Sequence, residues 1–418
     1  MNHRKRLGLT AVLAVAALLT GACGSGEATS SGGNSLLDEA AAKLTGEPIV
    51  IADISEVSGV PGFAPSAMPN GAKAAAAYIN DNGGIGGRPI KITSCDSKFD
   101  PGASAACAQQ AVAQKSLAVI GIDDFSSTGG DALFEKNNII TMNSPNQPTL
   151  IQSPNSFAIG PGGVGEFYGL GHYLGTTAKL KNISLLMQDQ PVGRTYAQQL
   201  EKAAKEAGVE TVNTVFFNPQ ITDFSASVAK VTSTDPEAVF TLVNGSQIPQ
   251  VWGQLQQQGI KPEQIYIHSV AMDAEVFDAA GPAAVGANVI SEFTNPDDLN
   301  DPDVKIFREA MDKYGFGDIA RSALAEWGFA NVMFLADAAK TIGADKVNAA
   351  TLKEYLTTTL APGSTTTIPT FLGSPAGAAP PEFPGIHRPG ISILRWDGTK
   401  FVTVEGFFTP PQLQPAQP

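Results

Sequence analysis

The stretch Asn70–Ile90, NGAKAAAAYINDNGGIGGRPI, decides the fold. Its first half, Gly71 to Asn80, is rich in alanine and predicts a helix. A run of glycines, Gly83 to Gly87, then breaks the helix, and the apolar strand Ile90 to Thr93 follows. Glycines that bind a dinucleotide join a strand to the helix after it, whereas these precede a strand. The stretch therefore indicates a helix that leads into a buried strand, and it does not indicate a nucleotide site.

The same alternation of short apolar runs and helices continues on both sides of this stretch. Short apolar runs between helices are typical of buried parallel strands, so residues 48–166 predict an α/β layered unit. The expected strands are 49–52, 90–93, 117–121 and 139–142, with helices at 71–80 and 104–114.

A second α/β unit starts near residue 183. Its expected strands are 183–187, 211–217, 238–243 and 264–267, with helices at 195–207, 224–231 and 248–258. Helices at 303–314, 321–341 and 350–357 and a Pro/Thr/Gly-rich loop at 361–389 follow. A hairpin at 391–396 and 400–407 turns at Asp397-Gly398. The tail 410–418 has no residues expected to form a core and is expected to be disordered.

The N-terminus predicts export. Arg4, Lys5 and Arg6 precede the apolar run Leu7 to Leu19, which is too short for a permanent membrane span, and small residues lead to Cys23. This order indicates a signal peptide over 1–22 and resembles a lipobox, in which the Cys23 thiol is lipidated. The alternative is an ordinary signal peptide with an incidental cysteine. Residues 23–47 are expected to be a flexible tether.

Charge and cysteine content narrow the function. Loss of the three basic residues of the signal takes the formal charge from −13 to −16, which makes nucleic acid a poor partner. Outside the cytosol, the pair Cys95 and Cys107 favours a disulfide. The four histidines are not clustered, so neither a metal site nor a cofactor is expected. No nucleophile elbow or catalytic frame accompanies them, so an enzyme is not expected.

The ordered motifs resemble a known family. The run Asn70 to Ile90 is similar to the signature of the branched-chain amino-acid (Leu/Ile/Val) type of periplasmic binding protein. Other landmarks agree in order and spacing, namely Ser58-Gly59, Cys95-Asp96, Asp100-Pro101, Val119-Ile120-Gly121, Ser126-Ser127, Asn143-Ser144-Pro145, Asp223-Phe224-Ser225, Tyr314-Gly315, and Trp327 where the family usually has Tyr. The resemblance covers about residues 48–360.

The resemblance implies a type I fold with two Rossmann-like lobes joined by three hinge crossovers. The first lobe would comprise residues 48–166 and 294–345, and the second 167–293 and 346–409. It implies a monomeric, lipid-anchored protein on the outer face of the cell membrane, which delivers solute to the permease and ATPase of an ABC importer. A ligand-sensing receptor subunit with the same clamshell is the alternative. A purely structural lipoprotein would need no cleft.

Ligands of doubly wound sheets bind beyond the carboxyl ends of the strands. Hydroxyls and free backbone N–H groups there suit a carboxylate, and the resemblance assigns that role to Ser126 or Ser127 and to Ser144. These serines could instead cap helices. The expected ligand-binding set is Ser55, Ser58, Phe63, Phe125, Ser126, Ser127, Asn143, Ser144, Gln188, Asp189, Asn244 and Val270.

The second half departs from the family at two places. Val192-Gly193 replaces the usual Tyr-Gly, and His268-Ser269-Val270 stands where the family has an acid for an α-ammonium group. A buried ammonium without a carboxylate is costly. The expected solute is therefore small and carries a carboxylate or amide, without necessarily being an amino acid.

Overall fold

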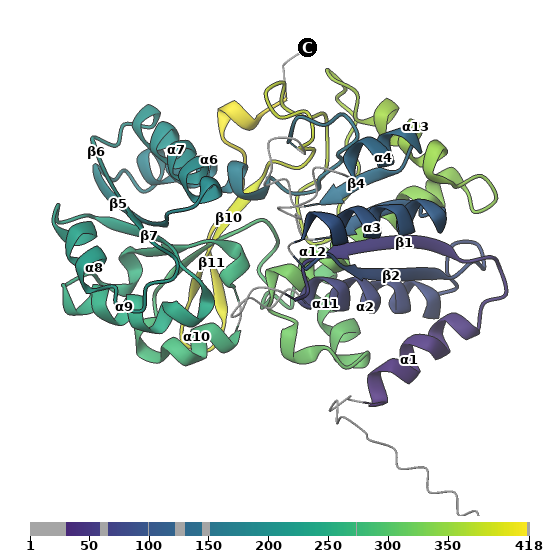
Figure 1. The fold of residues 1–418 in the computed structure, drawn as a ribbon, viewed down its shortest axis with the longest axis horizontal. Helices are drawn as coiled ribbons and strands as arrows, with labels where there is room; N and C mark the ends of the chain where they lie inside the picture. Colours follow the sequence, from purple (N-terminus) through teal and green to yellow (C-terminus); the bar gives the residue numbers. More distant parts are fainter. Residues whose placement is uncertain are drawn as a thin grey trace, which may run out of the picture.

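The protein has two α/β lobes, each built around its own sheet (Figure 1). The computed structural model describes residues 31–58, 66–98, 100–121, 130–143, 151–272 and 274–415. The chain passes between the lobes three times, at about residues 159–161, 292–297 and 377–390. The expected class, α/β with two Rossmann-like lobes and three crossovers, is confirmed.

The first lobe contains a parallel four-stranded sheet in the order β2-β1-β3-β4. Its central strand β1 pairs in register from Ile49↔Ile90 to Ser55↔Asp96 and is buried along nearly its whole length. Helices cover both faces of this strand, so nearly all of its side chains are buried and its sequence is a nearly continuous apolar run. The strands are β1 (Ile49–Ser55), β2 (Ile90–Asp96), β3 (Ala118–Gly121) and β4 (Ile140–Asn143).

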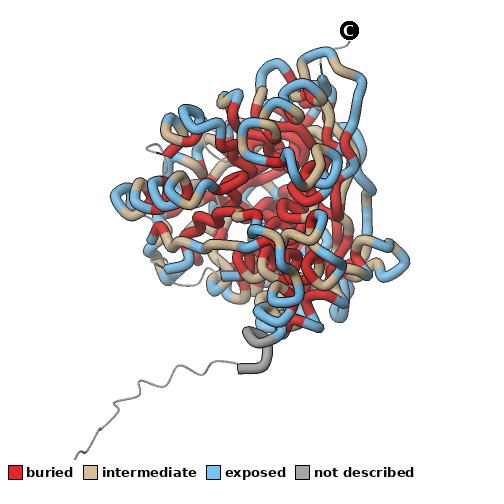
Figure 2. The backbone as a smooth tube through the Cα atoms, turned by 90° about the vertical axis from the view of Figure 1, so that its right-hand side faces the viewer, coloured by how far each residue is buried: buried red, intermediate tan, exposed pale blue. Residues whose placement is uncertain are grey.

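Helix α2 packs along α12 at the centre of this lobe. The alanines of α2 and the apolar face of α12 are fully buried, so the two backbones lie close together. Figure 2 shows buried chain throughout the interior and exposed chain in the outer helices and loops. The helices here are α2 (Ala67–Asp81), α3 (Pro101–Ala113), α4 (Asp131–Lys136), α11 (Pro302–Lys313), α12 (Ala323–Ile342) and α13 (Ala349–Thr359).

The structure places part of segment 346–409 in the first lobe, contrary to the expectation. Helix α13 packs on α12, and Leu352 and Leu356 are fully buried in the first lobe's core, as are Leu372 and Ala376. Only the later part, from β10 (Ile391–Trp396) onward, joins the second lobe's sheet. The expectation failed because the amphipathic pattern of α13 does not reveal which core its apolar side faces.

The second lobe contains a seven-stranded sheet in the order β11-β10-β9-β8-β7-β5-β6. Strands β5 to β9 are parallel, and β10 and β11 add an antiparallel edge. The strands are β5 (Asn182–Gln188), β6 (Thr211–Phe217), β7 (Ala238–Leu242), β8 (Ile265–Ile267), β9 (Asn288–Ser291), β10 and β11 (Phe401–Phe408). The helices are α6 (Gly162–Thr176), α7 (Pro191–Glu206), α8 (Ser225–Thr232), α9 (Ile248–Gln257) and α10 (Ala274–Ala280).

Both ends of the described chain are more ordered than expected. Residues 31–42, expected within a tether, form helix α1 (Ser31–Ala42), whose Ala40 is buried against α2. In the tail, Leu413 is fully buried beside Tyr168 and Ala203. The expectation of disorder from residue 410 is therefore wrong for residues 410–415, because a single apolar side chain anchors them.

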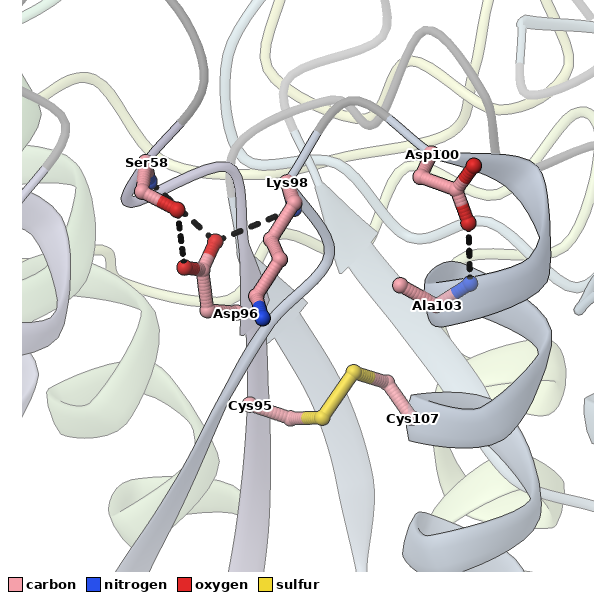
Figure 3. The surroundings of a disulfide bond; sticks show 7 residues. All are labelled: Ser58, Cys95, Asp96, Lys98, Asp100, Ala103 and Cys107. Atoms are coloured by element: carbon pink, nitrogen blue, oxygen red, sulfur yellow. Dashed lines mark hydrogen bonds between the residues drawn. A yellow bond between two sulfur atoms is a disulfide. The ribbon is translucent and has the colours of Figure 1, made fainter. Parts of the chain in front are cut away.

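The expected disulfide between Cys95 and Cys107 is present (Figure 3). Cys95 lies near the end of β2 and Cys107 on α3, with their Cα atoms 5.7 Å apart. Asp100 begins α3 by accepting a hydrogen bond from the Ala103 N–H at 2.7 Å. The bond and the cap together fix α3 against the edge strand of the first sheet.

Candidate functional site

The carboxyl ends of the parallel strands place the candidate site between the lobes. In the second lobe, β8 is followed by the short helix η3 (Ser269–Ala271), which packs against α12 of the first lobe. Ala323 at the start of α12 in turn packs into the second lobe's core. The end of β8 therefore faces the other lobe, and the segments after neighbouring strands line the same edge.

On the first lobe, the two described serines of the expected set bind other parts of the protein. The Ser55 Oγ donates to Asp53 Oδ1 at 2.6 Å, and both residues are fully buried. Ser58 donates to the Asp96 carboxylate through Oγ at 2.6 Å and through its backbone N–H at 3.2 Å (Figure 3). The expected ligand role of Ser55 has no support here, because its hydroxyl points inward. Ser58 instead fastens the segment after β1 to the end of β2.

The hydrogen bonds to Asp96 change its acidity. Partial burial raises its pKa, but donation by the Ser58 hydroxyl and by the backbone N–H groups of Ser58 and Lys98 outweighs burial and holds the pKa below the ordinary value. Asp96 is thus a carboxylate at neutral pH and keeps Ser58 in place. The remaining first-lobe candidates Phe63, Phe125, Ser126, Ser127 and Ser144 lie outside the described residues. Asn143 ends β4 beside Gly121.

On the second lobe, the structure brings two expected residues together. Gln188 at the end of β5 donates from Nε2 to Asn244 Oδ1 at 2.8 Å, and Asn244 follows β7. The backbone N–H of Asn244 donates to Gln247, which fixes the turn after β7. Two strand ends separated by 56 residues thus present one neutral amide surface.

The other second-lobe candidates differ in availability. Asp189 forms an ion pair with Arg194 at 2.6 Å, so its charge is already matched. Val270 lies on η3, and its side chain is among the exposed large apolar groups. An amide pair and an exposed valine form a wall suited to a solute with polar and apolar parts.

His268 directly precedes η3, at the position where the resemblance implies an acid. Its Nδ1 accepts the Val270 N–H at 3.2 Å, so the ring proton is assigned to Nε2. That Nε2 lies 2.5 Å from Oε2 of the fully buried Glu166 on α6. His268 stacks on Phe167 and Tyr196, with ring centroids 5.3 and 6.3 Å away. Both ring nitrogens of His268 thus contact other protein groups, and its ring face is covered by aromatic side chains.

Three further ionisable groups are buried, two on the crossovers and one on α12 of the first lobe. Glu292 follows β9 and accepts a hydrogen bond from the Gly162 N–H. Arg388, on the third crossover, stacks on Phe293 with its guanidinium carbon 4.8 Å from the ring centroid. Its Nε donates to the Ile159 carbonyl on the first crossover. Glu326 on α12 is fully buried, and Asp297, Arg308 and Arg388 are the charged groups that act on it.

Burial dominates the electrostatics of this cluster. Burial, and then the neighbouring Glu166, raises the pKa of Glu292 well above the ordinary value. The pKa of Glu326 is also raised well above the ordinary value, by burial and then by Asp297. Burial lowers the pKa of Arg388 to about 10, although Glu292 and Glu326 act in the opposite direction.

Sequence reasoning missed most of these residues. Glu326 and Trp327 lie in the middle of a helical pattern, which predicts packing and agrees with their burial in α12, but the pattern does not reveal a buried acid. Arg388 lies in a loop rich in Pro, Thr and Gly, where nothing marks a buried cation. The one available signal was a cluster of acids, Glu166, Glu292 and Glu326, within otherwise apolar segments.

No group of three or more potential metal ligands occurs within the described residues. In that same part of the chain, no helix is both long and apolar enough to cross a bilayer.

Comparison with known proteins decides the family. A family model described as periplasmic binding protein matches residues 48–373, most of the chain. This chain belongs to that family. Membership of this family places the binding protein outside the cytoplasm.

Relatives and solved structures agree with this placement. The binding protein is 27% identical to Leu/Ile/Val-binding protein homolog 1 of Brucella suis over 307 residues, 70% of this chain and 80% of the relative. It resembles a fatty acid ABC transporter substrate-binding protein from Thermomonospora curvata with a TM-score of 0.73 and 18% identity. That match covers 88% of this chain and 94% of the T. curvata chain. It also resembles a solute-binding protein from R. palustris in complex with benzoate, with a TM-score of 0.68 and 17% identity. That match covers 88% of this chain and 99% of the R. palustris chain.

Proposed function

We propose that this chain is the lipid-anchored receptor of an ABC importer and captures a small carboxylate- or amide-bearing solute by closure of its lobes. Its partners are the permease and ATPase subunits, and Cys23, outside the described residues, carries the anchor. The observation that carries the proposal is that two strand ends of the second lobe meet in the Gln188–Asn244 pair, while η3, after a neighbouring strand of the same sheet, packs against α12 of the first lobe within a two-lobed family fold.

The chemistry of the relatives supports a carboxylate. Their names cite leucine, isoleucine and valine, a fatty acid, and benzoate. All of these carry a carboxylate on an apolar body, whereas only the amino acids carry an ammonium group. The neutral amide pair and the exposed Val270 suit such a solute, and Asp189 is already paired with Arg194.

Closure follows from the three crossovers. Solute bound to one lobe gains contacts from the other only when the lobes approach, so binding shifts the population toward the closed form. The closed shape is then the signal that the permease recognises.

A thermal-shift screen of the mature protein tests the proposal. Branched-chain amino acids, benzoate, short-chain and long-chain fatty acids and primary amides form the panel. A solute present at 100 times its Kd should add about 2.7 kcal/mol to the free energy of unfolding. Absence of stabilisation by the whole panel at millimolar concentration would count against the proposed solute class.

Binding-site variants refine the test. Replacement of both Ser127 and Ser144 by alanine should weaken binding of the solute found by about 1–3 kcal/mol, because a buried carboxylate loses its donors. Gln188→Ala tests the opposite lobe. The matched control is Gln250→Ala, an exposed glutamine on α9. Calorimetry that finds equal affinity in the double variant and the parent would show that the site is misplaced.

The anchor has its own test. Cys23→Ala should abolish lipidation and release the protein from membranes into the aqueous phase of a detergent partition. A protein that stays in the detergent phase without Cys23 would exclude the lipobox assignment.

A further inference from the structure

Five buried ionisable residues connect the two lobes through the crossovers. Glu166 and His268 belong to the second lobe, Glu292 and Arg388 to the second and third crossovers, and Glu326 to the first lobe. All but His268 are at most 2% exposed, and His268 is 6% exposed. We call these five residues the hinge cluster. A lobe rotation about the crossovers must move at least some of its members relative to the others.

The hinge cluster contains more acids than bases. Three carboxyl groups face one guanidinium and one imidazole, and His268 makes its closest contact with Glu166 alone. Glu166 is the nearest acid to the fully buried Glu292, so its negative charge adds to the cost of ionising Glu292. Two neighbouring carboxylates shielded from water are costly, so this buried arrangement disfavours the ionised form of Glu292.

Glu326 is fully buried without a hydrogen bond to its carboxylate from any described residue. Among the described residues, neither of its carboxylate oxygens has a hydrogen-bond partner, and the same holds for both terminal nitrogens of Arg388. The charged groups nearest Glu326 are Asp297, Arg308 and Arg388. Asp297 is itself paired with Arg321 at 2.8 Å and with Arg308 at 3.4 Å. An ionised Glu326 would thus be buried with little direct compensation, which is costly.

The packing around Glu292 leaves no space for a water molecule to enter beside its carboxyl group. A Cβ atom on Gly160, on the first crossover, would lie 2.2 Å from Oε2 of Glu292 and 2.3 Å from the Trp327 ring. The ring of Trp327 also packs edge-on against Phe293, 5.2 Å away. Because the crossover backbone and Trp327 fill the space beside Glu292, hydration of Glu292 requires the lobes to shift.

We propose that the hinge cluster links lobe opening to proton release, so that deprotonation of Glu292 and Glu326 favours a more open protein. This inference rests on the lobe motion proposed above. The consequence is a solute receptor whose resting shape depends on the pH outside the cell. Acidic conditions stabilise the compact arrangement, and alkaline conditions loosen it.

Small-angle scattering of the solute-free mature protein at pH 5.5 and pH 9 tests this inference. For a compact chain of this size the radius of gyration is about 21 Å, and we expect a rise of about 1 Å at pH 9. The double variant Glu292→Gln/Glu326→Gln should stay compact at both pH values, because its side chains cannot ionise.

A matched variant controls for the general effect of charge. Glu210→Gln/Glu354→Gln removes the same number of acids from exposed positions and should expand like the parent. A parent that does not expand, or a hinge variant that expands equally, would overturn the inference. Circular dichroism confirms that each variant is folded. Should Glu292→Gln/Glu326→Gln not fold, Glu326→Gln alone should still halve the expansion or more.

The outcomes separate this inference from the proposed function. One outcome is that a panel solute lowers the radius of gyration at both pH values while the radius of the solute-free protein does not change with pH. In that case the receptor function stands and the proton linkage is excluded. If pH changes the shape but no solute does, the hinge responds to protons and the proposed solute class fails.

Discussion

A side-chain carbon on Gly71 of α2 would lie 2.1 Å from the carbonyl oxygen of Ala325 on α12. The reverse contact is equally close, because a carbon on Gly328 would lie 2.0 Å from the Met68 carbonyl oxygen. The two helices therefore pack backbone to backbone at the centre of the first lobe. Gly71 belongs to the stretch from which the fold was inferred, and its role is close approach.

Gly71→Ala should destabilise the protein by about 3 kcal/mol, because the added methyl group overpacks two rigid backbones. Chemical denaturation gives the free energy of unfolding. The control is Gly253→Ala on α9, where nothing lies within 4 Å of the added carbon. That change should be neutral or stabilise by up to about 1 kcal/mol. Similar unfolding energies for the two variants would show that α2 and α12 can separate freely.

The disulfide offers a second prediction about stability. Cys95→Ser/Cys107→Ser removes the link between β2 and α3, which closes a loop with a sequence separation of 12. For a loop of this size the bond stabilises the folded state by about 3 kcal/mol. Reductant should lower the unfolding temperature of the parent and leave that of the double variant unchanged. A parent that is indifferent to reductant would show that the bond contributes nothing.

The sequence predicted the alternating elements well where burial and pattern agree. Residues Thr211–Phe217 form β6 with the bounds expected, because seven residues of this kind between polar turns predict a strand and no other element. Strand β9 was not expected, since Asn288–Ser291 carries only two apolar residues and depends on β8 and β10 for its pairing. Helix α6 was also missed. Its glycines weaken the helical pattern, and packing on α7 compensates for them.

The candidate site was less predictable than the fold. The strand-end rule located Gln188 and Asn244 correctly on adjoining strand ends. It could not foresee that Ser55 turns inward to Asp53 or that Asp189 binds Arg194. It gave no indication of the hinge cluster, because Arg388 meets Glu292 and Glu326 only through the folded crossovers. The periodicity of apolar residues predicts which side chains are buried. Which distant charges become neighbours depends on the complete fold.

Asp53 allows a prediction about pH. Burial raises its pKa to about 6, although the hydroxyl groups of Ser55 and Ser94 and the charge of Lys73 partly oppose this shift. Because the folded-state pKa exceeds the unfolded value of 3.8, folding favours the protonated acid. Asp53 therefore costs stability as the pH rises from about 4 to about 6, and the cost persists above that range. The shift corresponds to about 3 kcal/mol.

Asp53→Asn should consequently be more favourable at pH 7.5 than at pH 4. The quantity to measure is the difference in unfolding free energy between variant and parent at each pH, by urea denaturation. We expect this difference to shift in favour of the variant by about 3 kcal/mol between the two pH values. An exposed control, Asp235→Asn, should show no such shift. A constant difference for Asp53→Asn would mean that the buried acid titrates normally.

The last prediction concerns the attachment of the N-terminal helix. Asp81 at the end of α2 accepts hydrogen bonds from Lys43 at 2.7 Å, Lys313 at 2.6 Å and Tyr314 at 2.8 Å. It thereby ties the chain after α1 to both α2 and α11. Donation by Lys313 and Lys43 lowers the pKa of Asp81 despite partial burial. The stabilisation is thus present above the ordinary carboxyl pKa and is lost only as the pH falls below it.

Asp81→Asn should release this segment at neutral pH, because a neutral amide loses the attraction of two ammonium groups. Limited trypsin digestion measures the effect, with mass spectrometry to follow cleavage after Lys43. We expect cleavage several times faster than in the parent, while the core of the lobe stays protected. The matched control is Asp337→Asn, since Asp337 pairs with Lys340 on an exposed part of α12 at 3.3 Å. Equal cleavage after Lys43 in both variants would show that burial of Ala40, and not the Asp81 contacts, holds α1 on the first lobe.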